Sequence, residues 1–453
     1  METCMDSSVS RTAEAAKLAS AVLASMNSEQ RKQALLTVAK ALEENADVIE
    51  QENKKDLDAA KAQVAKGELK DSLFQRLKLD KAKLAGTISG IRQIAEMVDP
   101  VGKVSLAREL DERLNLYRIA CPIGVVAVIF ESRPEAMPQI LSLCLKTGNA
   151  ILLKGGKEAE RSNRILFETM QKAAVQAGVP AEAFALLESR ADVNALLSAE
   201  GFVDLIIPRG SNDLVRYIQS NTKIPVLGHA DGICHVYVDR QADLDTAIKI
   251  TVDSKIQYPS ACNAAETLLI HEARLQDYLP KILSALQAKG VELRLDLECL
   301  QVLEKLSKEK RLNETLDLGQ IKSASDADWS CEYCEMIISV KAVSSLDEAI
   351  RHINKYGSGH TETMVTENEK SFEQFFAQVN SAGVYQNAST RFADGFRYGF
   401  GAEVGISTAK MHPRGPVGVE GLLSYKYKLL GAGHIVGDYS GPNAKSFTHR
   451  DLE

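Results

Sequence analysis

The chain has 453 residues, a net charge of −7 and a hydrophobic fraction of 45%, as expected for a globular protein. This length exceeds what one hydrophobic core ordinarily organises, so we expect two domains. The acidic balance disfavours a nucleic-acid or anionic-membrane partner. No apolar run approaches the roughly 20 residues of a membrane helix. The N-terminal residues lack a basic start followed by an apolar stretch, so we expect no secretion signal and a cytoplasmic location.

The first hundred residues predict helices. Apolar residues recur at three- and four-residue spacing over residues 11–26 and 29–62. Asn27 followed three residues later by Gln30 predicts a capping box that opens the second helix. Residues 106–120 alternate imperfectly around an acidic turn at Asp111-Glu112, which predicts a hairpin.

Strands and helices alternate after this hairpin, which predicts parallel sheets covered on both faces by helices. The strands predicted for a first series span residues 123–130, 149–154, 183–188, 203–208 and 224–228. A second series begins near residue 235, with strands at 235–239, 266–271 and 335–343 and helices at 275–290 and 345–357. A last strand is predicted within residues 425–439, before a polar tail that we expect to be frayed.

Three loops that follow predicted strands are candidate ligand sites, because open α/β sheets bind ligands at the ends of their strands. Residues 129–138 offer a serine and an arginine for an anion or a carbonyl, or simply cap a helix. Residues 152–163 hold two glycines between lysines, which suits a nucleotide or a flexible turn. Residues 206–214 place a glycine and a serine at a helix start, which suits a phosphate or an ordinary N-cap.

The chain has eight cysteines, which we expect to be reduced. Two stretches that contain cysteines are candidates for a function. Cys262 lies in "YPSACNAAET", where small neighbours would let a substrate reach a thiolate, although free cysteines are commonly buried. Cys331 and Cys334 form "CEYC", but no further pair of ligands follows for zinc. A redox pair would open a helix, whereas a strand is predicted here. We therefore predict incidental thiols and no metal site.

Six stretches together resemble one family. They are "PIGVVAVIFESRPEA", "GNAILLKGGKEA", "PRGSNDLV", "YPSACNAAETLL", "FRYGFGAEVGISTAKMHPRGPVGVEGL" and "GHIVGDYSG". In this order they resemble the glutamate-5-semialdehyde dehydrogenases, or γ-glutamyl phosphate reductases, a branch of the aldehyde dehydrogenase superfamily. The resemblance implies two Rossmann-like parallel-sheet domains with a hairpin and C-terminal strand for oligomerisation. It also implies reduction of L-glutamyl 5-phosphate to L-glutamate 5-semialdehyde by NADPH, with release of phosphate, in proline biosynthesis.

The resemblance also implies roles for individual residues. It makes Cys262 the nucleophile that forms a thioester, and it places Ser132 where the superfamily has an asparagine of the oxyanion hole. Lys157 replaces the acid of NAD-preferring relatives, and a cation there favours NADPH. The implied cofactor-binding residues are Lys154, Lys157, Gly210, Ser211 and Glu332. The implied substrate-binding residues are Arg133, Asn263, His412 and Arg414.

The resemblance divides the chain into functional parts. It implies a cofactor-binding domain at residues 1–103 and 122–228 and a catalytic domain at 229–426. It implies an oligomerisation element at 104–121 and 427–440, followed by a flexible tail at 441–453. We expect a homodimer or a dimer of dimers, and a partner in the upstream glutamate 5-kinase. No amino-acid kinase domain precedes the reductase motifs, so we expect the free-standing reductase.

Three other functions compete with this interpretation. A phosphate-independent aldehyde dehydrogenase needs a glutamate that activates water, but the corresponding position in "GHADG" is His229. A catalytically silent relative that acts through oligomerisation predicts a damaged nucleophile loop, whereas "PSACN" is intact. A redox sensor based on "CEYC" predicts a disulfide between Cys331 and Cys334.

Overall fold

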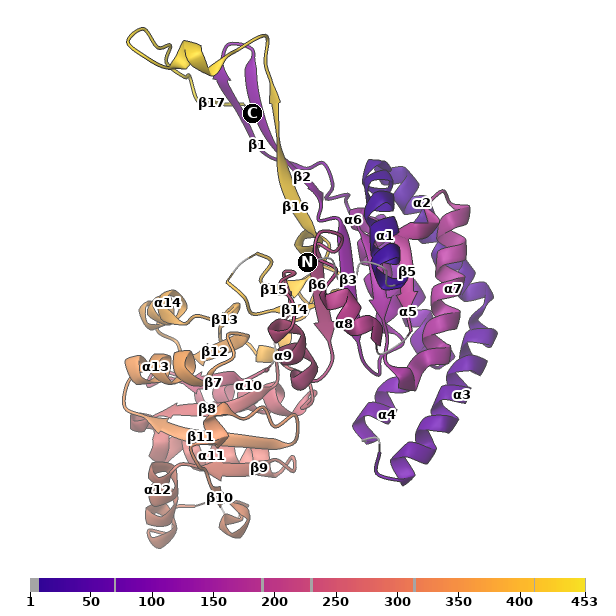
Figure 1. The fold of residues 1–453 in the computed structure, drawn as a ribbon. Coiled ribbons are helices and arrows are strands. Elements are labelled where there is room, and N and C mark those ends of the chain that lie inside the picture. The colour runs from indigo at the N-terminus through magenta and orange to yellow at the C-terminus, as the bar shows by residue number, and fades with distance from the viewer. Residues whose placement is uncertain are drawn as a thin grey trace. The chain divides into compact units, whose positions relative to one another are not determined.

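The computed structural model describes residues 8–68, 71–188, 191–228, 231–312, 315–410 and 412–452. The chain forms two compact units (Figure 1). The first unit comprises Met1–Leu227, Phe400–Gly405 and Val417–Glu453, and the second comprises Gly228–Gly399 and Ile406–Pro416. No helix in the described ranges is long and apolar enough to cross a membrane.

The first unit begins with the predicted helices, which are α1 (Ser8–Ser25), α2 (Ser28–Glu44), α3 (Ala46–Ala65), α4 (Asp71–Leu77) and α5 (Lys81–Glu96). The capping box at the start of α2 is confirmed. The Asn27 side chain accepts from the Gln30 N–H at 2.9 Å, and the Gln30 side chain accepts from the Asn27 N–H at 2.8 Å. The stretch at residues 29–62 is helical as predicted, but it is divided into α2 and α3 at Asn45. The Asn45 backbone leaves helical geometry, and its side-chain Nδ2 donates to the Ala41 carbonyl at 2.8 Å.

A parallel sheet with strand order β5-β4-β3-β6 forms the core of the first unit. Its strands are β3 (Val125–Phe130), β4 (Ala150–Lys154), β5 (Phe184–Leu187) and β6 (Leu205–Arg209). Its helices are α6 (Ala136–Thr147), α7 (Glu160–Gln176), α8 (Ala191–Leu197) and α9 (Asn212–Ser220). The strand predicted at 224–228 is reduced to one bridge between Ile206 and Val226. Pro225 has no N–H to extend the ladder.

An antiparallel sheet of order β16-β2-β1-β17 completes the first unit. Its strands are β1 (Val104–Asp111), β2 (Leu114–Pro122), β16 (Leu423–Leu430) and β17 (Arg450–Asp451). The predicted hairpin is confirmed, with its turn at Glu112 and at Arg113, whose φ is 64°. The end of the expected flexible tail instead pairs with β1, because Arg108 binds Asp451 at 2.7 Å and β17 continues the ladder.

The second unit is built on one parallel sheet of order β10-β9-β11-β8-β7-β12-β13. Its strands are β7 (Cys234–Val238), β8 (Ala265–His271), β9 (Glu292–Leu295), β10 (Lys322–Ser323), β11 (Ile337–Val343), β12 (Thr361–Val365) and β13 (Gly383–Gln386). Its helices are α10 (Leu244–Ile256), α11 (Leu275–Gln287), α12 (Leu297–Lys308), α13 (Leu346–Tyr356) and α14 (Glu369–Gln378). The short strands β14 (Gly405–Ser407) and β15 (Gly415–Val417) pair with each other. The predicted second β/α series is therefore confirmed.

Candidate active site

Cys262 lies in a loop at the edge of the second unit's sheet where the strands begin. The loop ends at β8, and the segments holding Gly232 and His360 end at the starts of β7 and β12. Because these strands are parallel, their starting ends meet at one edge. There the Cys262 Sγ lies 3.2 Å from the Nε2 of His360. The structure therefore unites two side chains that are 98 residues apart in sequence.

Gly232 fixes the position of the Cys262 backbone. A Cβ added at Gly232 would lie 2.3 Å from the Cys262 carbonyl oxygen and 2.5 Å from its Cα, closer than any side chain tolerates. The same carbonyl accepts a hydrogen bond from the Cys234 thiol at 3.4 Å. Only glycine therefore permits this close approach of two backbone segments.

His360 is the principal residue that the sequence patterns did not reveal. Its side chain is buried, and its Nδ1 lies 2.8 Å from the Oγ1 of Thr361. A histidine directly before a buried strand carries no spacing signal toward a distant cysteine. Only the pairing of β7 with β8 and β12 brings it to Cys262.

Arg391, in the turn Thr390–Phe392 (η6), is a second residue that was not predicted. Its guanidinium is buried, donates from Nε to Gln257 at 2.8 Å and lies over the Tyr258 ring. Burial, followed by the Arg397 charge, lowers the pKa of Arg391, while interaction with Cys262 acts in the opposite direction. Arg391 is therefore a buried cation that acts electrostatically on the candidate nucleophile.

Asn263 ties the nucleophile loop to the segment around η6. Its Nδ2 donates to the Ala393 carbonyl at 2.9 Å, and its own carbonyl accepts from the Thr390 hydroxyl at 2.7 Å. In the part of the chain that the structure describes, its buried Oδ1 has no hydrogen-bond partner. The Nδ2 donor of Asn263 is therefore already used in a hydrogen bond within the protein. The contact of Asn263 with the substrate stays a prediction.

Two of the predicted substrate residues lie in the segment after β14. His412 is exposed, and Arg414, also exposed, donates from Nη2 to the Asn380 carbonyl at 3.0 Å. Arg414 and Lys410 line a hollow of about 200 Å³ together with Gly359, the residue that precedes His360. The structure therefore brings Arg414 to the segment that carries His360. Arg133 follows β3 in the first unit, and its role toward the substrate stays a prediction.

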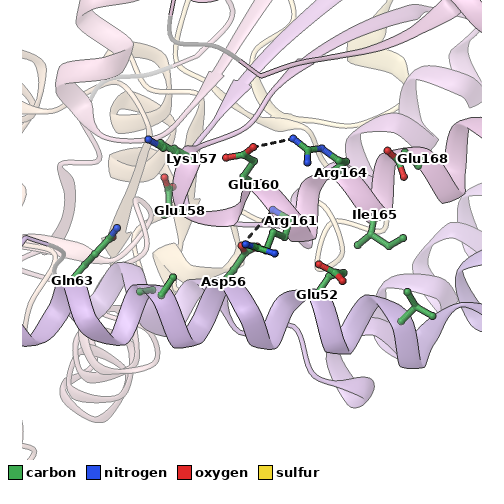
Figure 2. A pocket seen from close by; sticks show the side chains of 13 residues that line it. Glu52, Asp56, Gln63, Lys157, Glu158, Glu160, Arg161, Arg164, Ile165 and Glu168 are labelled. Atoms are coloured by element: carbon green, nitrogen blue, oxygen red, sulfur yellow. Dashed lines mark hydrogen bonds and ion pairs between the residues drawn. The ribbon is translucent and has the colours of Figure 1, made fainter.

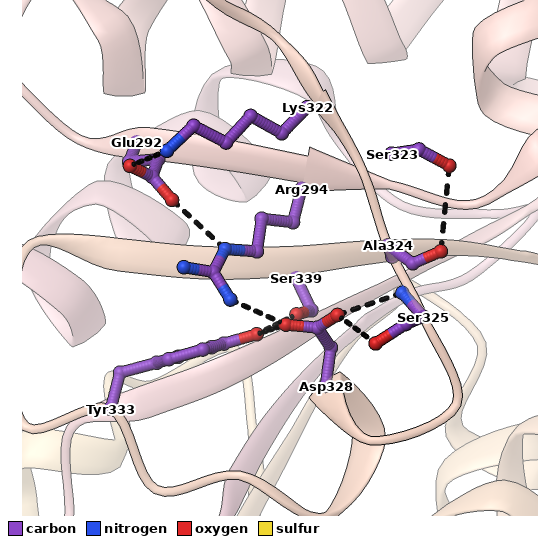
Figure 3. Close-up of polar contacts among 9 residues, drawn as sticks. All are labelled: Glu292, Arg294, Lys322, Ser323, Ala324, Ser325, Asp328, Tyr333 and Ser339. Atoms are coloured by element: carbon purple, nitrogen blue, oxygen red, sulfur yellow. Dashed lines mark hydrogen bonds and ion pairs between the residues drawn. The ribbon is translucent and has the colours of Figure 1, made fainter.

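The loop before β11, which carries Glu332, is held by a network of polar contacts. Figure 3 shows this network around Asp328 and Tyr333. The Tyr333 hydroxyl lies 2.6 Å from both Asp328 and Ser339, and Arg294 donates to Asp328 at 2.7 Å. Burial acts to raise the pKa of Asp328, but the hydrogen bonds outweigh it and hold the pKa below its usual range. This network fixes the backbone that presents Glu332.

Cys331 and Cys334 are free thiols on this loop. Burial raises the pKa of Cys331, and burial followed by the charges of Glu332 and Glu266 raises the pKa of Cys334 to about 12. Thiols that stay protonated are poor nucleophiles for disulfide exchange. Their environment therefore favours the prediction of incidental thiols over a redox pair.

A buried ion pair lies under the nucleophile loop. Lys255 on α10 contacts Glu266 on β8 at 2.5 Å, and both side chains are buried. Burial raises the pKa of Glu266 to about 7, although Lys255 and the Cys334 N–H act to lower it. The pair therefore fixes the end of α10 to the start of β8 at a considerable cost in desolvation.

Ser132, the predicted oxyanion donor, follows β3 in the first unit. It has a left-handed backbone with φ of 48°, and both its N–H and its hydroxyl donate to Glu158 Oε1 at 2.7 Å. The hydroxyl must therefore leave Glu158 before it can donate to a substrate. The role of Ser132 stays a prediction.

Gly210 and Ser211 open α9 as predicted, with Ser211 as the N-cap. The Ser211 N–H donates to the Glu131 carboxylate at 2.9 Å. A Cβ at Gly210 would lie 2.4 Å from the same carboxylate oxygen, so glycine makes room for an anion here. Glu131 thus occupies the helix start where a phosphate was predicted.

Lys154 and Lys157 flank the loop after β4. Lys154 is buried, which lowers its pKa, and its Nζ bonds the Gly155 carbonyl. Lys157 is exposed at the rim of a hollow of about 760 Å³ between α3 and α7 (Figure 2). Within the described ranges no side chain forms an ion pair with Lys157, whereas Arg164 in the same hollow pairs with Glu160. His229, predicted in place of the water-activating acid, lies outside the described residues.

The fold matches that of an acetylating aldehyde dehydrogenase from Geobacillus thermoglucosidasius, with a TM-score of 0.64 at 18% identity over 94% of this chain and 97% of that one. At this identity the match shows the fold alone, and the fold is that of the aldehyde dehydrogenases.

More similar proteins define the family. The family model of the aldehyde dehydrogenase family matches residues 1–335. A gamma-glutamyl phosphate reductase from Synechococcus sp. (strain JA-2-3B'a(2-13)) is 54% identical over 92% of this chain and 89% of its own. The crystal structure of a gamma-glutamyl phosphate reductase from Thermotoga maritima superposes with a TM-score of 0.88 at 34% identity, over 95% of this chain and all of that one. The chain therefore belongs to the aldehyde dehydrogenase family and, within it, to the gamma-glutamyl phosphate reductases. Membership makes it an oxidoreductase that takes a nicotinamide cofactor and a small-molecule substrate.

The buried ion pair predicts an asymmetry between single and double substitutions. Glu266→Gln leaves the Lys255 ammonium buried without its carboxylate and should lower the free energy of unfolding by about 3 kcal/mol. The double variant Lys255→Met with Glu266→Leu removes both charges and should lie within about 1 kcal/mol of the wild type. Urea unfolding at pH 8 followed by circular dichroism measures both. Equal decreases in the free energy of unfolding in the single and the double variant would contradict the buried ion pair.

The same pair predicts a pH dependence. Because the folded pKa of Glu266 lies above its ordinary value of 4.5, the folded chain holds this proton more tightly than the unfolded chain. Its contribution to stability is therefore largest at low pH and declines as pH rises from about 4.5 to 7. The decline should disappear in the double variant, in which neither residue titrates.

Proposed function

We propose that the chain reduces L-glutamyl 5-phosphate to L-glutamate 5-semialdehyde with NADPH and releases phosphate, in the cytoplasm. The main support is the half-buried Cys262 thiol against His360, in a chain that belongs to the gamma-glutamyl phosphate reductases. A thiol in a loop of small residues can attack an acyl phosphate, and a thioester is a better hydride acceptor than a carboxylate.

The protein residues account for the first half of this reaction. The Cys262 sulfur attacks the acyl carbon, the carbon–oxygen bond to phosphate breaks, and phosphate leaves with the electron pair. Arg391 contributes positive charge that interacts with the sulfur. Arg414 and Lys410 supply cations for the carboxylate or phosphate of the substrate.

The nicotinamide, when bound, supplies the hydride that reduces the thioester to the aldehyde. The residues of the first unit suit a dinucleotide: Lys154 and Lys157 offer cations, and Gly210 leaves room for an anion at the start of α9. Lys157, which has no paired acid in the described residues, suits the 2′-phosphate of NADPH. Phosphate exchange in place of hydrolysis is consistent with the absence of a glutamate from "GHADG".

The hairpin and C-terminal strand are proposed to join two copies of the chain. β16 is an edge strand, and its side chains Tyr425, Tyr427 and Leu429 lie on one face, each more than half exposed. An exposed apolar row on an edge strand invites pairing with another chain. We therefore propose a homodimer or a dimer of dimers. The labile acyl phosphate also makes the upstream glutamate 5-kinase a proposed partner.

The reverse reaction tests the proposed activity. Pyrroline-5-carboxylate, in equilibrium with the semialdehyde, should reduce NADP⁺ only in the presence of inorganic phosphate. Cys262→Ala should lower this rate by at least about 1000-fold because the covalent route is lost. Absorbance of NADPH measures it. Reduction without phosphate would instead support the phosphate-independent aldehyde dehydrogenase, and folded protein without activity would support the silent relative.

The cofactor preference is tested at Lys157. Lys157→Glu should raise the KM for NADPH about tenfold, the effect of losing about 1.4 kcal/mol of charge-assisted contact, and should leave the KM for NADH within about twofold. Lys172→Glu on α7 makes the same charge change at a position outside the hollow. An equal effect on both cofactors would show that Lys157 does not contact the 2′-phosphate.

The proposed dimer is tested on β16. Replacing Tyr427 and Leu429 by lysine places two charges on the apolar row and should shift the chain to monomers in sedimentation velocity. Replacing Lys426 and Lys428 by glutamine on the opposite face is the control and should leave the assembly intact. A wild-type monomer, or an unchanged assembly of the double lysine variant, would contradict the proposal.

A further inference from the structure

We propose that His360 accepts the thiol proton of Cys262 and so makes the sulfur nucleophilic. The inference names a further catalytic residue, and it rests on the proposed function only for the identity of the substrate. The observation behind it is the distance of 3.2 Å between the His360 Nε2 and the Cys262 Sγ. The histidine is only 1% exposed, so water does not compete for this contact.

The second nitrogen of His360 contacts a hydroxyl that can accept its proton. Nδ1 lies 2.8 Å from the Thr361 hydroxyl, which in turn hydrogen-bonds the Tyr385 phenol. Tyr385 continues the chain to Tyr398. We assign the order in which Nδ1–H donates to Thr361 and Thr361 donates to Tyr385, because the Thr361 hydrogen bond acts to lower the pKa of Tyr385, as a donor to its oxygen does. This order leaves the Nε2 lone pair directed at the Cys262 thiol, as proton transfer requires.

The proposed step balances with the reaction. The S–H bond of Cys262 breaks and its proton moves to Nε2, while the sulfur forms a bond to the acyl carbon. The carbon–oxygen bond breaks, and phosphate leaves with the electron pair and takes a proton from solvent. After reduction, the carbon–sulfur bond breaks, the sulfur keeps the electron pair, and the proton returns from Nε2. His360 therefore ends each turnover in its starting state.

Other ionisable groups around the pair do not serve as the acceptor. Charged or titratable side chains reach this region from each neighbouring element: Cys234 on β7, Glu266 on β8, Glu362 on β12, Tyr385 on β13 and Arg391 in η6. Burial raises the pKa of Cys234 and of Tyr385, so both stay protonated near neutral pH. Glu362 is engaged by His235 and Ser381. Glu266 is engaged by Lys255. Among the described residues, His360 is the ionisable group whose nitrogen contacts the sulfur.

Alkylation of Cys262 by iodoacetamide tests the inference without any substrate. The rate is measured from pH 5.5 to 9.5 by mass mapping of the peptide that contains Cys262, in the full chain. His360→Asn should slow alkylation at pH 7 about tenfold or more and move the half-maximal rate to higher pH. His271→Asn makes the same substitution at the opposite end of β8, where Nδ1 caps the Ala273 N–H, and should match the wild type. Unchanged rate and pH profile in His360→Asn would overturn the inference.

A second pair of variants decides the question even if His360→Asn does not fold. Thr361→Val keeps the shape of a β-branched residue but removes the partner of Nδ1, and it should slow alkylation about threefold. Thr361→Ser keeps the hydroxyl and should restore the wild-type rate. Equal rates in the two Thr361 variants would contradict the assigned tautomer and the proton transfer.

Activity and alkylation separate the two proposals. Suppose that His360→Asn slows alkylation and that the wild type shows no phosphate-dependent reduction of NADP⁺. This result would refute the proposed function and leave the inference standing. Suppose instead that His360→Asn is alkylated at the wild-type rate and that the wild type reduces NADP⁺ in the presence of phosphate. This result would refute the inference alone.

Discussion

The parallel register of the second unit's sheet is the constraint on which the candidate active site depends. Every strand pair of this sheet in the described ranges is parallel, so the loops before β7, β8 and β12 converge at one edge. Cys262 lies in an irregular loop, and its position is set by what surrounds it. Gly232 allows the two backbones to touch, and His360 meets the sulfur. A one-residue slip of β8 or β12 would move the attached loop by about 3.3 Å, as much as the distance between the sulfur and the nitrogen, and would separate the pair.

This constraint also explains where the sequence patterns succeeded and failed. Alternating apolar segments are sufficient to predict both β/α series, since buried parallel strands have a strong signature. The failures are local. Pro225 ended a predicted strand, Asn45 split a predicted helix, and the tail paired with β1 through Arg450 and Asp451. Each of these three differences from the prediction depends on one side chain or on a partner that is distant in the sequence.

The candidate site was predictable in part for the same reason. Cys262 was found from its small neighbours and from the family motif, and Ser211 from its place before a helix. His360 and Arg391 were missed because each is 98 or more residues from Cys262 and neither lies in a spaced motif around it. Loops that meet only through sheet pairing leave no periodic signal in one sequence. Open α/β sheets generally bind ligands at the carboxyl ends of their strands, whereas Cys262 and His360 lie at the edge where the strands begin.

The anion sites of the first unit are already satisfied by the protein's own carboxylates. Glu131 accepts from the Ser211 N–H at the start of α9, and Glu158 accepts twice from Ser132. Without such partners these donors would be left to water or unpaired, at a cost of about 1–3 kcal/mol for each one buried. A phosphate that binds at α9 must displace Glu131, so one anion replaces another and the helix start keeps a partner throughout. The exchange disfavours weakly charged ligands, because only a group with more charge than a carboxylate gains from it. The pyrophosphate of a dinucleotide, which carries two negative charges, would meet that condition. In the proposed NADPH site, Lys157, with no acid paired to it in the described chain, would add attraction for a 2′-phosphate that a neutral ribose hydroxyl would not receive.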